Sequence, residues 1–156
     1  MPEIVELLAS PIHRFEGRPS DGPSPAPAGE LVPAVEVRAG LGIVGDRYFG
    51  KPAHRDASVS LIARESLPPG TSLAQARRNI LVSEIPVDDL VGTILTLDSG
   101  AGPVRLKVHG KAHPCAWMDV TVGPGAWKAL RGKGGVLCAP LNDGILRIGP
   151  VEAKWE

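Results

Sequence analysis

Cys115 has the surroundings that best suit a reactive thiol. It follows Pro114, whose fixed φ and missing amide hydrogen predict a rigid bend just before the thiol. The segment 115–119 can open a helical turn, and free amide hydrogens at a helix start favour a thiolate. Lys111 and His113 add positive charge nearby. The pattern indicates a nucleophilic or metal-binding thiolate; the alternative is a small buried hydrophobe, as free cysteines often are.

The second cysteine, Cys138, lies in the apolar segment 135–139, which is typical of a core strand. Two cysteines in a chain of this size do not form a disulfide framework. They are too far apart for a Cys-x-x-Cys motif, and the four histidines are scattered, so a tetrahedral zinc site is not expected.

A glycine-rich segment at 40–48 contains Asp46 and Arg47 and is followed by Lys51 and His54. Its glycine spacing does not match a dinucleotide fingerprint, because no helix or βαβ unit accompanies it. One interpretation is a tight turn with a surface ion pair, which would contribute little energy. The other is an oxyanion site held by Arg47 with Lys51 and His54, in which Asp46 orients Arg47.

A third cluster, Arg77-Arg78-Asn79, enters a predicted strand. It could be a solvated helix end, favoured there by the helix dipole. Alternatively, Arg78 and Asn79 face the same anion as Arg47. A neutral chain with three separate basic clusters favours a focused positive pocket. These clusters span 47–55, 77–79 and 105–111.

The chain has 156 residues, which fits one domain with one core. Its 17 basic and 17 acidic residues cancel, so a nucleic-acid partner is not expected. We find no leader-like N-terminus and no apolar run long enough to span a membrane. We therefore expect a cytoplasmic protein with reduced thiols and no membrane partner.

The elements that must position these residues are short strands, because 19 glycines and 16 prolines punctuate the chain. In 104–108, Val and Leu alternate with Arg and Lys, which predicts one buried and one basic face. The other predicted strands cover 4–8, 32–37, 57–62, 80–82, 93–97, 136–139 and 145–148.

Two short helices are predicted, after the Ser72/Gln75 capping pattern and over 124–131, the second with Trp127 and Leu130 toward the core. The Pro-rich loop 17–30 is predicted to be a polar excursion that does not pack. Many strands without a βαβ rhythm favour a mainly β fold with a closed or barrel-like β structure and two or three short helices.

The order of the motifs resembles that of the MOSC domain, the module named after the C-terminal region of molybdenum cofactor sulfurase. The resemblance runs from about Ile4 to about Val151. It rests on Gly42-Ile43-Val44-Gly45-Asp46-Arg47, then Arg77-Arg78-Asn79-Ile80-Leu81-Val82, Leu90-Val91-Gly92, Pro114-Cys115, Gly134-Gly135-Val136 and Gly144-Ile145-Leu146-Arg147-Ile148-Gly149.

The resemblance implies a single barrel-like MOSC domain over 1–156 that binds the molybdenum cofactor (molybdopterin) or another anionic, pterin-type small molecule. The Pro-Cys motif maps to Cys115, which would carry sulfur or contact molybdenum. The Gly-Asp-Arg motif maps to Gly45, Asp46 and Arg47, and the Arg-Asn motif to Arg78 and Asn79.

Three functions remain as alternatives. The chain could be a cofactor-binding or sulfur-carrier protein, or a catalyst: a sulfurtransferase or a component of a molybdenum-dependent reductase, with a sulfur donor or redox protein as partner. It could also be a non-enzymatic binding or delivery module in which Cys115 is structural. The residues expected around the ligand are Cys115 with Arg47, Lys51, His54, Arg78, Asn79 and His113.

Overall fold

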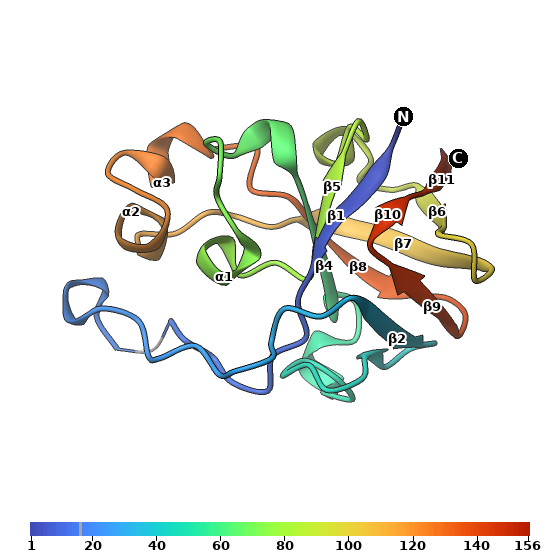
Figure 1. Cartoon of the computed structure of the whole chain (residues 1–156), viewed down its shortest axis with the longest axis horizontal. Helices are drawn as coiled ribbons and strands as arrows, with labels where there is room; N and C mark the ends of the chain where they lie inside the picture. Colours follow the sequence, from blue (N-terminus) through green and yellow to red (C-terminus); the bar gives the residue numbers. More distant parts are fainter. Residues whose placement is uncertain (16) are drawn as a thin grey trace.

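The protein is a mainly β structure built around one eight-stranded sheet (Figure 1). The computed structural model describes residues 1–15 and 17–156. The strands follow one another across the sheet in the order β10-β1-β5-β4-β8-β7-β6-β11, and only the β4–β5 pair is parallel. Their bounds are β1 Glu3–Leu7, β4 Val59–Ala63, β5 Ile80–Ser83, β6 Ile94–Asp98, β7 Pro103–Lys111, β8 Val136–Pro140, β10 Gly149–Pro150 and β11 Glu152–Trp155.

The sheet is nearly closed because its two edge strands are neighbours in the sequence. β10 pairs with β1 at one edge, and β11 pairs with β6 at the other. A second sheet of three strands, β3-β2-β9, shares the same hydrophobic core. Its strands are β2 Ala34–Arg38, β3 Gly42–Ile43 and β9 Gly144–Arg147. The barrel-like fold expected from the sequence is therefore confirmed.

The alternation of apolar and polar residues along β7 determines which face of this strand is buried. Val104, Leu106 and Val108 are fully buried, whereas Arg105 and His109 are exposed. Each predicted strand corresponds to a strand of the structure, with ends that differ by a few residues. The sequence did not indicate β3, β10 or β11.

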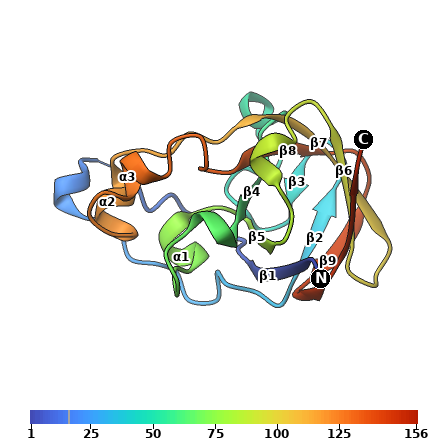
Figure 2. The same ribbon diagram turned by 90° about the horizontal axis from the view of Figure 1, so that it is seen from above.

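Three short helices lie together at one end of the molecule (Figures 1 and 2). They are α1 Leu73–Ala76, α2 Trp117–Thr121 and α3 Ala126–Ala129, and they share a second core with Leu8 and Ile62 of the barrel. Four 3₁₀ turns complete the fold: η1 Pro19–Asp21, η2 Pro52–His54, η3 Arg64–Ser66 and η4 Val87–Asp89. In the described part of the chain, no helix has the length and apolar character that crossing a membrane requires.

One predicted helix start is confirmed, whereas the helix predicted over 124–131 covers only Ala126–Ala129, and one of its side chains was placed wrongly. The capping box of Ser72 and Gln75 is present at α1. In α3, Ala126 and Leu130 are buried, but Trp127 is 42% exposed. Ala126 and Leu130 are four residues apart and so share one helix face, while Trp127 is rotated by about 100° from Ala126.

The Pro-rich loop 17–30 runs outside the strands of the barrel, and of its residues only Glu30 is buried. Its turn η1 contacts α2, and Figure 2 shows the excursion running along the helical end of the molecule. Just before it, the ring of Phe15 stacks on Trp117 with centroids 5.2 Å apart and an interplanar angle of 4°. No apolar side chain of 17–30 is buried, so the contacts with the helical end come from the η1 backbone region and from the preceding Phe15.

Candidate functional site

Asp46 and Arg47 form a buried pair rather than a surface ion pair. The Asp46 carboxylate accepts hydrogen bonds from Arg47 Nη1 (3.1 Å), from the Ser10 amide (3.1 Å) and from the Tyr48 amide (3.3 Å). The Arg47 side chain is 7% exposed, and its guanidinium lies 4.6 Å from the centre of the Tyr48 ring. Asp46 thus fixes the turn and orients Arg47, which is the role predicted for it.

Arg77 is a buried structural residue, so the solvated helix end that was one interpretation of its cluster does not describe it. It ends α1 with φ 59°, in the left-handed region. Its Nη1 donates to Glu30 Oε1 at 2.7 Å, and its Nη2 donates to Ser10 Oγ at 3.2 Å. Burial lowers the pKa of Arg77, and the hydrogen bond to Glu30 opposes that shift. Because Ser10 precedes the excursion and Glu30 closes it, Arg77 ties the two ends together.

Arg78 is held by a different part of the chain from Arg77. Its Nε donates to the Gly134 carbonyl at 2.9 Å. Its Nη2 is buried and has no hydrogen-bond partner among the residues described. Burial lowers the pKa of Arg78; the ionised forms of Cys115 and Tyr48 oppose the shift, and Arg47 adds to it. A buried donor without a partner is costly, so this guanidinium is suited to an incoming acceptor.

The side chain of Asn79 forms hydrogen bonds that hold the strand next to Arg78 in place. Its Oδ1 accepts from the Ser60 amide (2.9 Å) and the Ser60 hydroxyl (3.1 Å), and its Nδ2 donates to the Leu8 carbonyl (3.1 Å). These contacts join β5 to its two neighbours, β4 and β1. The structure places this amide within the framework, outside the pocket described next.

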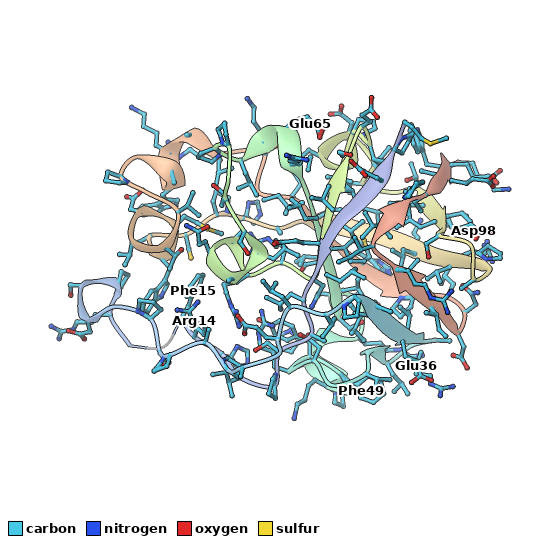
Figure 3. All side chains as sticks on the ribbon, in the orientation of Figure 1. Arg14, Phe15, Glu36, Phe49, Glu65 and Asp98 are labelled. Atoms are coloured by element: carbon cyan, nitrogen blue, oxygen red, sulfur yellow. The ribbon has the colours of Figure 1, made fainter. Side chains whose placement is uncertain are left out.

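Arg47 and Arg78 line the same small pocket, with a volume of about 170 Å³. Among residues 1–15 and 17–156, its lining contains four arginines and no carboxylate. Arg14 belongs to it and is held by the Ser24 carbonyl (2.7 Å) and the Ala74 carbonyl (2.8 Å). Figure 3 shows Arg14 and Phe15 close together between the excursion and the helical end. The lining residues are His13, Arg14, Phe15, Arg47, Tyr48, Arg77 and Arg78.

The remaining predicted ligand residues lie outside this lining. Lys51 precedes η2 and His54 ends it; both are exposed, although the His54 ring lies 4.8 Å from the Tyr48 ring. His113 is exposed next to the Pro114-Cys115 bend. Sequence reasoning missed His13, Arg14 and Phe15, because no local pattern links them to a strand or to another basic cluster.

Cys115 is exposed, and it lies just before α2. Its carbonyl accepts the Met118 amide at 2.9 Å, so the predicted helical turn is present. Cys138, by contrast, is fully buried, and burial raises the pKa of its thiol from 9.0 to about 12. In the described part of the chain, no three His, Cys, Asp or Glu side chains cluster as metal ligands. Cys115 is therefore the chain's own candidate for a soft ligand.

Gly134 connects Cys115 with Arg78. Its carbonyl holds Arg78, and its Cα packs closely against the segment that precedes Cys115. A Cβ at this position would lie 2.4 Å from the Ala112 carbonyl oxygen and 2.9 Å from Pro114 Cδ. Only glycine permits this approach, so the bend before Cys115 and the guanidinium of Arg78 are parts of one packed unit.

Comparison with solved structures shows what fold this is. The chain is similar to the YuaD protein from Bacillus subtilis, with a TM-score of 0.72 and 18% identity over 99% of this chain and 96% of that one. It is also similar to YiiM from Geobacillus stearothermophilus (TM-score 0.62, 18% identity, 99% and 75% covered) and YiiM from Escherichia coli (0.58, 16%, 99% and 70%). Scans of protein-family models and of curated proteins give no match. These likenesses support the MOSC-like fold implied by the order of motifs.

Proposed function

We propose that the chain binds the molybdenum cofactor, or a related pterin phosphate, with its phosphate in the arginine pocket and its sulfur-bearing end at Cys115. The observation that carries the proposal is Arg78, whose buried Nη2 has no partner among the described residues. A guanidinium presents donors in a planar fork that suits phosphate oxygens. The described residues that line the pocket include four arginines and no carboxylate, so their charges attract such a ligand.

The pocket is large enough for the terminal phosphate of the cofactor but too small for the whole cofactor. Ligand cavities for drug-sized molecules measure about 300–1,000 Å³, and this one measures about 170 Å³. A phosphate fits that volume, so the pterin would lie outside it. When bound, the cofactor would supply a molybdenum ion held by sulfur, and a soft thiolate such as that of Cys115 is a suitable contact for it.

The chain's own residues have separable roles in this proposal. Arg47 and Arg78 bind the anionic end; Asp46 and Asn79 keep the turn and the strand that carry them in place. Cys115 carries sulfur or contacts the metal. Because Cys115 is exposed, it is accessible to a donor or acceptor protein. The same exposure argues against the alternative in which Cys115 is only a packing residue.

The test is to produce the protein in cells that make the cofactor and in cells that cannot. Bound pterin and molybdenum are then measured, for the native chain, for Arg78→Gln and for Arg105→Gln, an exposed arginine of β7 outside the pocket. We expect pterin in the native chain and in Arg105→Gln from competent cells only, and a loss of at least about tenfold in Arg78→Gln. Absence of pterin from the native protein would refute the proposal.

A further inference from the structure

The four arginines of the pocket differ in how their charges are balanced. Arg47 is paired with Asp46 at 3.1 Å, and Arg77 with Glu30 at 2.7 Å. Among residues 1–15 and 17–156, no carboxylate makes an ion pair with Arg14 or Arg78. Within this described part of the chain, two positive charges of the pocket are therefore uncompensated.

The groups that hold Arg14 and Arg78 are neutral. Arg14 donates to two carbonyl oxygens, at Ser24 and Ala74, and Arg78 donates to a third, at Gly134. Carbonyl oxygens fix the direction of a guanidinium without cancelling its charge. Each side chain is thus oriented by the fold while its charge remains available to a ligand.

Gathering these cations in one small pocket costs electrostatic energy, which an anion can recover. Arg47 acts on both Arg77 and Arg78, and Arg14 acts on Arg77, in each case against the charged form. Like charges repel more strongly in a partly buried site than in water. A ligand with two negative charges would balance the two uncompensated guanidinium groups, whereas a singly charged ligand would balance one.

We infer that the pocket selects a doubly charged tetrahedral oxyanion, such as phosphate, sulfate or the phosphate end of a monoester, and that Arg14 is the residue that sets this charge preference. The inference rests on the proposed anion pocket and adds a residue of the segment that leads into the excursion. Arg14 reaches the pocket from outside the barrel motifs. It is a specificity residue because it adds the second uncompensated charge beside Arg78.

Sulfate and perchlorate test this inference, because both ions are tetrahedral but sulfate carries two negative charges and perchlorate carries one. Binding is measured by titration calorimetry at constant ionic strength, with Arg14→Gln, Arg78→Gln and Arg18→Gln. Arg18 is the matched control, an exposed arginine farther along the excursion that does not line the pocket. We expect the native protein to prefer sulfate by about tenfold or more, and Arg14→Gln to reduce this preference to about threefold or less. Arg18→Gln should keep the native ratio.

The outcomes separate a failure of Arg14 from a failure of the pocket. If sulfate binds and Arg78→Gln abolishes it while Arg14→Gln keeps the native ratio, the role of Arg14 is refuted and the pocket stands. If the native protein binds neither anion, the pocket itself is refuted. Thermal melting of each variant checks that it is folded, and Arg14→Lys should retain the sulfate preference.

A further arm distinguishes a free ion from the end of a larger ligand. Inorganic phosphate is compared with glycerol 3-phosphate under the same conditions. Equal affinity within about threefold supports a phosphate monoester as the natural form, because the ester substituent then lies outside the cavity. Binding of inorganic phosphate alone supports a free oxyanion, and binding of neither refutes selection of a phosphate-like dianion.

Discussion

Replacing Gly134 by alanine tests whether Arg78 and Cys115 share one packed unit. The new Cβ would lie 2.4 Å from the Ala112 carbonyl oxygen, 2.9 Å from Pro114 Cδ and 3.1 Å from Pro114 N. Ordinary contacts between such atoms are wider than 3 Å, so the two segments must separate by about 1 Å. Two of these three atoms belong to the backbone and the third to a proline ring, so no flexible side chain can absorb the movement.

The expected cost follows from that clash and from the bond that it disturbs. Forcing extra volume into a well-packed site costs about 1–3 kcal/mol. The same movement shifts the Gly134 carbonyl, which accepts Arg78 Nε at 2.9 Å. Weakening this hydrogen bond adds about 1 kcal/mol or more, because Arg78 then has a second donor without a partner. We expect Gly134→Ala to lower the free energy of unfolding by about 2–4 kcal/mol.

The measurements are urea unfolding and sulfate binding, and Gly110→Ala is the control. No atom lies within 4 Å of a Cβ built at Gly110, and neither this glycine nor Gly134 has a positive φ. Gly110→Ala should change the free energy of unfolding by less than about 1 kcal/mol. Gly134→Ala should also weaken sulfate binding and change the rate at which iodoacetamide modifies Cys115. Native stability, affinity and rate together in Gly134→Ala would refute the reasoning.

Two further predictions concern a buried ion pair and a buried thiol. Arg77→Ala leaves Glu30 without its partner and should lower the free energy of unfolding in urea by about 3–5 kcal/mol. The double variant Arg77→Ala/Glu30→Ala should recover part of this loss. An equal loss in the single and double variants would contradict an uncompensated Glu30 charge as the cause. Burial raises the pKa of Cys138 from 9.0 to about 12, so the folded state favours the neutral thiol. This stabilisation is complete below pH 9 and is lost as the pH rises toward 12, at up to about 1.4 kcal/mol per pH unit. Cys138→Ala, compared by unfolding over that range, should lack this slope, and an identical slope would contradict the assignment.

Most strands could be predicted because their residues carry the information locally. The alternation of 104–108 matches the burial of β7, and the apolar stretch at 59–63 matches β4, whose five residues are all buried. Two missed strands, β3 and β10, have two residues each and exist only through their pairing partners. The third, β11, has no buried residue, and its pairing with β6 alone defines it.

The candidate site could be predicted only in part, because long-range contacts decide which cations meet. Arg47 and Arg78 belong to motifs with a fixed order, so their shared pocket could be anticipated. Arg77 could not be distinguished from Arg78 by its neighbours. The burial of Arg77 depends on its ion pair with Glu30, which is 47 residues away in the sequence. Arg14 enters the pocket because Arg77 and Trp117 fix the path of the excursion, and neither lies near it in the sequence.

Arg78 is the electrostatic link between the pocket and the thiol. Its charge is favoured by an ionised Cys115 and opposed by Arg47. An anion in the pocket and a thiolate at Cys115 would therefore both be attracted to the same guanidinium while repelling each other. Because interaction free energies between two sites are reciprocal, we expect an anion bound in the pocket to change the rate at which iodoacetamide modifies Cys115.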